Sequence, residues 1–339
     1  MNTALSSLLT LCIGATVLSY IITGVVAKSG FLSDPVSARS NHTVPTSRAG
    51  GLVVLFVAIT LCGVAWSAGA PLPPPVAVMA LCAGALGALD DATPLAPTLK
   101  LGVLLALSIL TTLVSGVVLA VPIPFVGMVA LPALVAWPLA VFFVLGFVNA
   151  FNFMDGLNGM AGGIGMAGIG LIVATGAAGS VGLVIVALIL AAVLFGFTIR
   201  NVMKGSIFLG DAGSLSVGLF LAASALWSSQ ADASYFYIFA IGMLPLIIDT
   251  AFTLLRRARE GKSVLDAHKE HLYQRLREQG WSHQAVSAAY TALTILCGTL
   301  ALSLGRSPTG LWLAGVLGIA AYSAAIFWMF RFRSGGSPN

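Results

Sequence analysis

Apolar runs of roughly 20 residues recur along this chain from end to end, and each has about the length that a helix needs to cross a bilayer. Hydrophobic side chains make up 58% of the 339 residues and charged ones only 8%, which lies outside the composition of soluble globular proteins. A water-soluble enzyme is therefore excluded, and the sequence predicts an all-α integral membrane protein with many spans. The first run, 4–27, is too long for a signal-peptide core, so we expect it to be retained as a span.

Breaks at charges, prolines and glycine clusters divide the chain into about eleven predicted transmembrane helices. They cover residues 4–27, 50–68, 75–89, 99–120, 128–148, 159–177, 180–199, 212–229, 235–255, 285–303 and 310–330. No linker or repeat interrupts them, so we predict a single domain over 1–339. Its cytoplasmic loops are expected at about 28–49, 90–98, 149–158, 200–211 and 256–284.

The basic residues predict how these helices are oriented. Of the 16 Lys and Arg residues, only Arg306 falls on one side of the membrane, and the others share the opposite side. Loops rich in Lys and Arg mark the cytoplasm, so the N-terminus is expected to be periplasmic and the C-terminus cytoplasmic. The location would be a bacterial inner membrane. The basic face is suited to anionic lipid headgroups, and we expect no nucleic-acid partner.

The cysteines exclude a secreted disulfide scaffold. Cys12, Cys62, Cys82 and Cys297 all lie inside apolar runs and lack metal-like spacing. We interpret them as small hydrophobic residues.

Acidic residues collect at the predicted cytoplasmic ends of helices that are far apart in sequence. Only Asp232 of the 11 acids falls on the outer side, and Asp249 is an exception because it lies within the ninth span. Charged side chains are costly in a bilayer, so acids at span ends usually mark a site. If the helices pack as one bundle, these ends can converge on a cleft at the cytoplasmic face.

Two of these acids are adjacent. Asp90 and Asp91 end the third span, and Lys100 follows them. Paired carboxylates near a bilayer repel each other unless a cation neutralises them, and Mg²⁺ prefers such hard oxygen ligands. The alternative is an acidic turn that ends a helix, but acids at that position oppose the helix dipole.

A second group follows the fifth span. Asn149, Asn152, Asp155 and Asn158 recur at a spacing of three, which on a helix places them on one stripe. Such stripes are often contacts between membrane helices. Here the stripe ends in a glycine-rich turn, where backbone amides can approach a phosphate, and we therefore favour a site.

A third group opens the eighth span, where Gly210 and Gly213 flank Asp211. Asp211 or Ser214 is suited to be a simple helix cap. The glycines on both sides indicate instead that a ligand approaches the backbone at the positive end of the helix.

The longest predicted loop, 256–284, is basic, and we expect it to be helical after Leu265. His268 and His271 share one face, with Arg275 one turn further on. We interpret them as ligands of anionic substrate groups, because nothing nearby completes a zinc site; a solvated or lipid-facing helix is the alternative. The opening loop adds Arg48 near the same face.

Together these groups indicate phosphoryl transfer to a lipid. Carboxylates and amides suit magnesium, and basic residues at a membrane surface suit phosphates, so catalysis would consist of positioning and charge neutralisation. A lipid phosphate has a second pKa near about 6 and is already largely ionised at neutral pH. A strong general base is then optional.

The segments that carry these residues are LDDATPLAPTLKL, NAFNFMDGLNGMAGG and IFLGDAGS, preceded by RSNHTVPTSRAGG. In this order they resemble the polyprenyl-phosphate N-acetylhexosamine-1-phosphate transferase superfamily, over about residues 28–280. The resemblance implies that undecaprenyl phosphate attacks the β-phosphorus of a UDP-linked N-acetyl sugar and releases UMP, with Mg²⁺ as cofactor. Direct attack and a covalent aspartyl intermediate are both open, and we favour direct attack because the nucleophile is already charged.

The resemblance also implies residue roles. Asp211 and Asn152 would hold the metal ion, and Asp90, Asp91, Asp155 and Lys100 would be catalytic. Substrate contacts would come from Asn149, Asn158, Arg48, His268, His271 and Arg275. A homodimer is possible, and the membrane lipid itself is the remaining expected partner.

Two positions depart from the pattern of the superfamily. Asn158 stands where many members have Asp, so it is not expected to be an obligatory base. After His271 the chain reads Leu272, Tyr273, Gln274, where bacterial members often have further histidines. The chain resembles the branch that initiates O-antigen-like polysaccharides, whose sugar is N-acetylglucosamine or a 6-deoxy relative such as N-acetylfucosamine or N-acetylquinovosamine.

Rival functions from other classes make different use of polar residues. A transporter or flippase for lipid-linked sugars would place them near the bilayer midplane, whereas here they concentrate at the cytoplasmic helix ends, with Asp249 the exception. A membrane scaffold accounts for neither the paired acids nor Asp211. A CDP-alcohol phosphotransferase lacks its motif in this chain.

Overall fold

The computed structural model describes residues 2–34, 46–71, 74–175, 179–263 and 269–332. Helices dominate the described chain, with two short pairs of strands. The helices are α1 (Asn2–Ser29), α2 (Gly50–Ser67), α3 (Pro75–Ala92), α4 (Pro97–Ser115), α5 (Ala133–Phe153), α6 (Met160–Ala174), α7 (Val181–Lys204), α8 (Gly210–Ser229), α9 (Ala233–Gly242), α10 (Leu244–Arg259), α11 (Leu272–Glu278), α12 (His283–Leu304) and α13 (Pro308–Arg331). The strands are β1 (Ser33–Asp34), β2 (Thr46–Ser47), β3 (Ala120–Ile123) and β4 (Gly127–Ala130).

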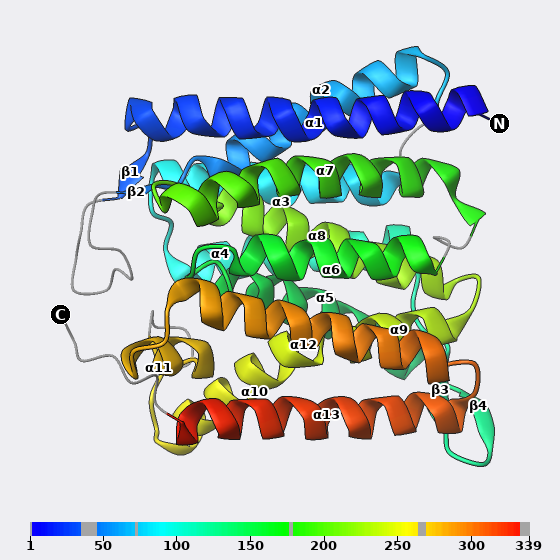
Figure 1. The fold of residues 1–339 in the computed structure, drawn as a ribbon. Helices are drawn as coiled ribbons and strands as arrows, with labels where there is room; N and C mark the ends of the chain where they lie inside the picture. The colour runs from blue at the N-terminus through cyan, green and yellow to red at the C-terminus, as the bar shows by residue number, and fades with distance from the viewer. Residues whose placement is uncertain (1, 35–45, 72–73, 176–178, 264–268, 333–339) are drawn as a thin grey trace.

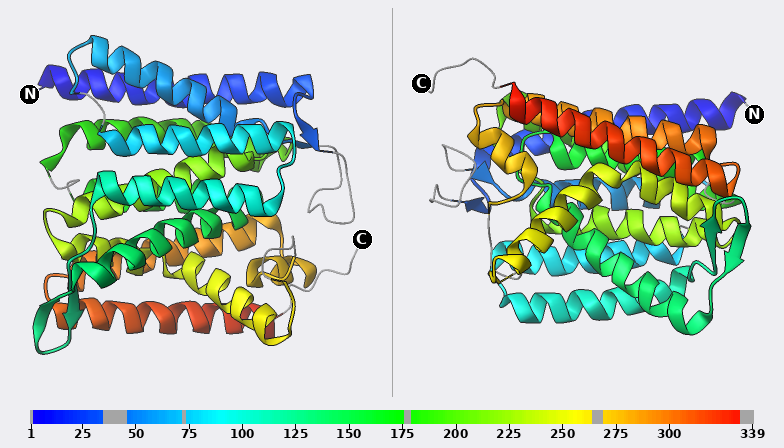
Figure 2. Two further views of the ribbon diagram at one scale, coloured as in Figure 1. Left: turned by 180° about the vertical axis from the view of Figure 1, so that it is seen from behind. Right: turned by 90° about the horizontal axis from the view of Figure 1, so that it is seen from below.

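The long helices run side by side as one bundle, and α8 lies in its interior (Figure 1; Figure 2 shows the same layers from behind and from below). Helix α8 packs against α2, α3, α4, α5, α6 and α9. Its small residues allow such close approach on every side, and nearly the whole helix is buried. Asp211 therefore sits at one end of the most enclosed helix of the bundle.

Membrane-length helices account for most of the predicted spans. Within the described residues, nine helices are long and apolar enough to cross a bilayer, and α9 with α10 adds a tenth if the bent pair is one span. The shorter α6 occupies the position of the sixth predicted span. The prediction of a helical, many-span protein is confirmed, while the number of crossings and their orientation stay predictions.

The ninth predicted span, 235–255, is not one helix. Helix α9 ends at Gly242 and α10 begins at Leu244, and the two are bent by 68° relative to each other. Pro245 lies in the first turn of α10. Proline lacks the N–H that would continue the ladder of hydrogen bonds, so the chain restarts its helix here in a new direction.

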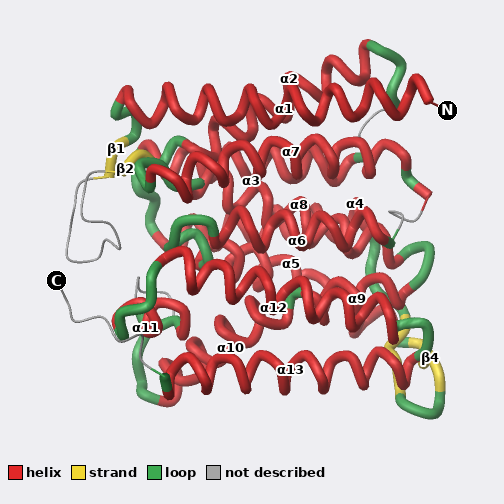
Figure 3. The backbone as a smooth tube through the Cα atoms, viewed as in Figure 1, coloured by secondary structure: helices red, strands yellow, loops and turns green. Residues whose placement is uncertain are grey.

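The fourth and fifth predicted spans are wrong at their facing ends. Helix α4 stops at Ser115, before Gly116 with φ of +84°, and residues 120–130 form an antiparallel β3–β4 hairpin in place of helix. This hairpin and the β1–β2 pair lie at opposite ends of the bundle (Figure 3). The chain is thus not purely helical, because short strands join helix ends outside the spans.

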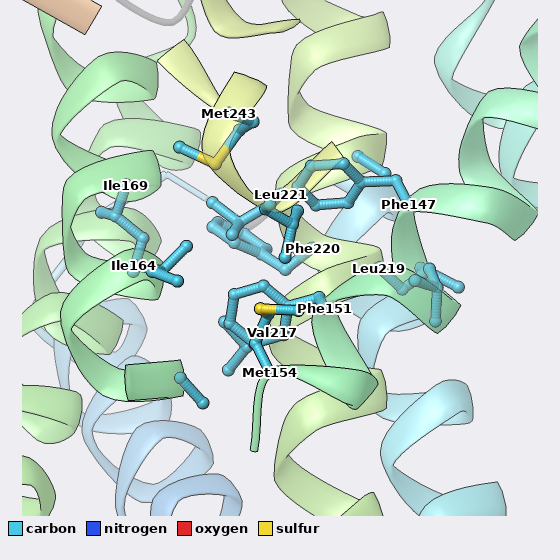
Figure 4. Close-up of a cluster of buried hydrophobic side chains, with 14 of the residues drawn as sticks. Phe147, Phe151, Met154, Ile164, Ile169, Val217, Leu219, Phe220, Leu221 and Met243 are labelled. Atoms are coloured by element: carbon cyan, nitrogen blue, oxygen red, sulfur yellow. The ribbon is translucent and has the colours of Figure 1, made fainter. Parts of the chain in front are cut away.

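A buried apolar cluster joins α5, α6 and α8 (Figure 4). Its members include Phe147, Phe151, Met154, Ile164, Ile169, Val217, Leu219, Phe220, Leu221 and Met243, all at most 3% exposed. Large apolar groups packed at this density tolerate little displacement. The cluster therefore holds the C-terminal end of α5 in a fixed position beside the N-terminal end of α8.

Candidate functional site

Four helix ends meet at the end of the bundle that carries β1–β2 and α11, on the left in Figure 1. They are the end of α3, the start of α4, the end of α5 and the start of α8. Hydrogen bonds from side chains and from the backbone of α8 bring six of the predicted site residues together: Asp90, Asp91, Lys100, Asn152, Asp155 and Asp211. We call these six residues the acid cluster. The predicted convergence of distant segments is thus observed, and the chemical roles of the residues stay predictions.

Lys100 joins two of the carboxylates. Its Nζ donates to Oδ2 of Asp90 at 2.8 Å and also to Oδ2 of Asp211. The other oxygen of Asp90 accepts from the backbone N–H of Leu95 at 2.7 Å, which fixes the turn between α3 and α4. The side chains of Lys100, Asp90 and Asp211 are 20%, 15% and 26% exposed. A substrate in solution can therefore reach these three side chains.

Asn152 holds Asp211 from its other side. The Nδ2 of Asn152 donates to Oδ1 of Asp211 at 2.7 Å and to Oγ of Ser214 at 2.8 Å. Ser214 in turn donates to the carbonyl oxygen of Gly210 at 2.8 Å. The carboxylate of Asp211 is thus gripped between the Lys100 ammonium and the Asn152 amide, so its orientation is set before any ligand binds.

Asp91 and Asp155 bind the N-terminal end of α8. Asp91 accepts from the backbone N–H groups of Asp211 at 3.1 Å and Ala212 at 2.9 Å, and Asp155 accepts from that of Gly210 at 2.6 Å. We expected this glycine-flanked helix start to receive substrate phosphates. In the structure these three N–H groups instead donate to carboxylates of the chain itself. The same carboxylates lie at the positive end of the helix dipole.

The environment of Asp155 disfavours negative charge. Burial raises the pKa of this carboxyl well above its ordinary value; the hydrogen bond from Gly210 acts in the opposite direction, and the carboxylates of Asp91 and Asp211 raise it further. Even with Asp155 neutral, the other three carboxyl groups of the acid cluster outnumber the single ammonium group of Lys100. A further cation is electrostatically favoured here.

Glycines allow the helices of the site to touch. A Cβ on Gly87 of α3 would collide with the backbone of Asp211, and one on Gly210 would lie 2.8 Å from Oδ2 of Asp91. Gly210 also has a φ of +68°, which side chains rarely adopt. These glycines permit the close approach that places Asp91 on the first turn of α8.

We expect the substitution Gly87→Ala to lower the stability of the protein by about 1–3 kcal/mol, because the added methyl group pushes α3 away from the start of α8. Gly102→Ala on α4 is the matched control, since a Cβ there meets nothing within 4 Å. Thermal unfolding in detergent measures both variants. Equal unfolding temperatures for the two would contradict the close contact.

The predicted stripe from Asn149 to Asn158 is only partly helical. Helix α5 ends at Phe153, so Asp155 and Asn158 lie in the turn that follows. Asn149 donates to the carbonyl of Leu145 in its own helix at 2.7 Å. The backbone carbonyl of Asn158 accepts from Ser287 of α12 at 2.8 Å. Only Asn152 and Asp155 of this stripe therefore join the acid cluster.

The other predicted substrate contacts lie around it. The backbone N–H of Arg48 donates to Leu32 at 3.0 Å, and its carbonyl lies against Gly210. Arg275 lies over the ring of Phe330, with 5.8 Å from its guanidinium carbon to the ring centre. His271 is buried and opens α11, which is shorter than the helix predicted after Leu265. His268 lies outside the described residues.

Ion pairs within the chain neutralise part of the basic loop. Glu270 binds Arg256 at 2.9 Å and Arg257 at 2.5 Å, and Lys262 lies 3.4 Å from the same carboxylate. We predicted contacts with anionic substrate for His268, His271 and Arg275, and we assigned no role to the other basic residues of this loop. Three of these others serve the structure of the loop, which leaves fewer positive charges for a ligand.

Asp249 lies near this loop, and from the sequence we assigned it no role beyond its unusual place within an apolar span. Asp249 in α10 binds His271 of the loop and Tyr290 of α12. The available signal was an acid within an apolar span, which usually has a partner or a function. Tyr273, a position where the chain departs from the superfamily pattern, is fully buried in the same region.

The acid cluster suits a magnesium ion that substrate completes. In the described part of the chain, no three His, Cys, Asp or Glu side chains are placed to hold a metal by themselves. Asp90 and Asp211 nevertheless direct oxygens at one cationic group, the Lys100 ammonium. Magnesium commonly takes one or two carboxylates and fills its shell with water and substrate phosphates. Asn152, the other predicted metal ligand, turns its Nδ2 toward Asp211 and so orients that carboxylate. Asp91 and Asp155 bind the backbone of α8, which leaves Asp211 and Asp90 as the carboxylates best placed to hold the ion.

Comparison with known proteins shows which family this chain is similar to. The family described as Glycosyl transferase family 4 matches residues 74–229, which include every member of the acid cluster. The chain is 30% identical to the decaprenyl-phosphate N-acetylglucosaminephosphotransferase of Mycolicibacterium smegmatis, over 92% of this chain and 85% of the relative. The similarly named protein of Mycobacterium leprae is 29% identical, over 80% of this chain and 77% of its own. A shorter match, 29% identical over 32% of this chain and 31% of the relative, is to the probable undecaprenyl-phosphate N-acetylglucosaminyl 1-phosphate transferase of Bacillus subtilis.

Proposed function

The chain belongs to glycosyl transferase family 4, among the polyprenyl-phosphate N-acetylhexosamine-1-phosphate transferases, and from that premise we propose its reaction. It transfers an N-acetylated sugar 1-phosphate from a UDP-sugar to undecaprenyl phosphate and releases UMP. The observation that carries the proposal is the Asp211 carboxylate, held between Lys100 and Asn152 with Asp90 beside it. This is a preorganised charged group at a helix end that phosphates can reach.

The reaction joins two anions, so charge neutralisation is its main requirement. An oxygen of the lipid phosphate forms a bond to the β-phosphorus of the donor, and the bond from that phosphorus to the bridging oxygen of UMP breaks. Lys100 is placed to bind a phosphate oxygen while it remains beside Asp90 and Asp211. Asp91 and Asp155 hold the start of α8, and so hold Asp211 in register with Lys100.

Magnesium is the proposed cofactor, and Asp211 with Asp90 would hold it. When bound, the ion would neutralise charge on the diphosphate. The proposed site requires Asp211 to keep its orientation, which Asn152 provides through Nδ2. Lys100 then serves as the second positive group, on the side of Asp90.

The proposed setting is the cytoplasmic face of a bacterial inner membrane, at the first step of an O-antigen-like surface polysaccharide. The sugar proposed first is N-acetylglucosamine, which the names of the relatives carry. N-acetylfucosamine and N-acetylquinovosamine are the alternatives, because Tyr273 and Gln274 depart from the superfamily pattern in a loop that the resemblance to the superfamily associates with the sugar.

A UMP-release assay tests this proposal. We expect purified protein in detergent to release UMP from UDP-N-acetylglucosamine only when a polyprenyl phosphate is present. EDTA should reduce the rate to background, and excess Mg²⁺ should restore it. The panel includes UDP-N-acetylgalactosamine and both 6-deoxy donors, with decaprenyl and undecaprenyl phosphate as acceptors.

The same assay separates the enzyme from a transporter. A flippase would move a preformed lipid-linked sugar and would release no UMP from any donor. No release across the whole panel, with correctly folded protein, would overturn the proposed function. UMP release that continues in the presence of EDTA would support the transferase activity and contradict the proposed magnesium cofactor.

A further inference from the structure

A second polar centre lies apart from the acid cluster, on α10. Asp249 is fully buried. Its carboxylate has five hydrogen-bond partners: the backbone N–H of Leu272 (3.0 Å), the backbone N–H of Tyr273 (3.1 Å), Nδ1 of His271 (3.2 Å), the hydroxyl of Tyr290 (2.5 Å) and the hydroxyl of Thr253 (3.5 Å). A buried carboxylate is stable only when such partners surround it. Three of the five partners belong to His271 and the first turn of α11.

Asp249 therefore fixes how α11 begins. The contact of 3.2 Å between Nδ1 of His271 and Oδ1 of Asp249 fixes the orientation of the imidazole ring. The backbone N–H of His271 donates to the side chain of Gln274 at 3.1 Å, which closes the same turn. Hydrogen bonds to Asp249 thereby hold the start of α11 to α10, and the side chain of Gln274 closes the first turn of α11.

The other face of α11 reaches the C-terminal end of α5. The hydroxyl of Tyr273 donates to the carbonyl oxygen of Phe153 at 2.6 Å, and the His271 ring lies 5.1 Å from the Phe153 ring. Burial, with the charge of Asp249 adding to it, raises the pKa of the Tyr273 hydroxyl well above its ordinary value, so that it stays a donor. Phe153 is the last residue of α5 and follows Asn152 directly.

We infer that Asp249 is a positioning residue for the acid cluster. It holds His271 and Tyr273 against Phe153, and the end of α5 then presents Asn152 and Asp155 to the start of α8. We call Asp249, His271, Tyr273 and Phe153 the Asp249 clamp. The effect of the clamp on the rate of the reaction rests on the proposed function. Its effect on the position of α5 does not. The inference also gives Tyr273 a purpose, since its hydroxyl makes a contact that ties α11 to α5.

Kinetics test whether the clamp acts on the chemical step. We expect Asp249→Asn, which keeps the shape but loses the charge, to lower kcat roughly tenfold to a hundredfold, as small misplacements of catalytic groups do. The KM for each substrate should change less than about threefold. Tyr273→Phe, which loses only the hydroxyl, should act in the same way but less strongly. The double variant should be no slower than Asp249→Asn alone, because both changes break one connection.

Tyr322→Phe is the matched control. Its hydroxyl lies 3.2 Å from that of Tyr290, at the far end of the same buried network. It loses the same group as Tyr273→Phe, so equal losses of kcat in the two variants would show general weakening of the protein. That result would overturn the inference.

Hydrogen–deuterium exchange tests the clamp without any activity. In Asp249→Asn we expect faster exchange of the amides in 270–278 and in 150–158, with α3 unchanged. Faster exchange confined to 270–278 would show that the clamp does not reach α5 and would overturn the inference. If amide exchange in Asp249→Asn becomes faster in the whole protein, the variant Tyr273→Phe decides between the two outcomes. Faster exchange limited to 150–158, together with a reduced kcat, would support the clamp. Unchanged exchange and unchanged kcat in Tyr273→Phe would reject it.

The kinetic and the exchange experiments also show separately whether the clamp or the proposed function is wrong. A wild-type protein that releases no UMP from any donor would overturn the function, while the exchange pattern would still show whether Asp249 holds α11 to α5. An active wild type with unaltered kcat in Asp249→Asn and Tyr273→Phe would overturn the inference and leave the function intact.

Discussion

Replacing Asp211 by asparagine is expected to lower magnesium-dependent UMP release by roughly a hundredfold to a thousandfold, as the loss of a preorganised charged group at a reaction centre does. Asp211 accepts from both Lys100 and Asn152. Asparagine keeps the shape but removes the negative charge that pairs with Lys100 and would bind the metal. The measurement is kcat for UMP release, with the Mg²⁺ concentration varied.

Asp232→Asn is the matched control for this variant. Asp232 lies at the other end of α8, where its carboxylate caps α9 through the N–H of Ser234 at 2.8 Å. Asparagine is also a good cap, so activity should stay within about twofold of wild type. Full activity in purified Asp211→Asn, or equal losses of activity in the two variants, would contradict a metal site at Asp211.

Replacing Lys100 by methionine is expected to lower kcat roughly a hundredfold. The ammonium joins Asp90 to Asp211, and methionine leaves two carboxylates facing each other without a positive group between them. We expect the folded structure to survive, because these side chains are partly exposed and water can solvate them. Lys100→Arg should recover only part of the rate, since a planar guanidinium does not reproduce a compact ammonium.

Lys204→Met provides the comparison for Lys100→Met. Lys204 is exposed at the end of α7, so the same change of side chain there should leave kcat unchanged. Rates and thermal unfolding are measured on both proteins. A loss of less than about threefold in Lys100→Met would show that the bridging ammonium has no part in the reaction.

The apolar helices could be predicted from the sequence because length and composition are local properties. Each predicted span corresponds to a helix or to the bent pair α9–α10 in the described residues. The errors lie at the facing ends of the fourth and fifth predicted spans and in the middle of the ninth. Gly116 ends a helix and Pro245 lies where the helix changes direction. Both effects depend on backbone geometry, which a hydropathy pattern does not record.

The members of the site could be predicted for a related reason. Carboxylates and amides in a chain this apolar need partners or functions, so Asp90, Asp155 and Asp211 were recognisable from position alone. Their pairing was not. Asp91 and Asp155 bind the backbone of α8, whereas Asp90 and Asp211 share Lys100. That division depends on how α3, α5 and α8 are rotated and shifted relative to each other.

The sequence by itself determined that this chain is a helical membrane protein with most of its acids at one set of helix ends, because burying charge in hydrocarbon is costly at every position. Only the tertiary structure decided which of these groups pair with side chains and which hold the backbone of another helix in place. Asp249 makes the distinction clear: a lone acid in an apolar span became the anchor of α11 through donors about 22 to 41 residues away in sequence. Contacts of that range come from the packing of whole helices.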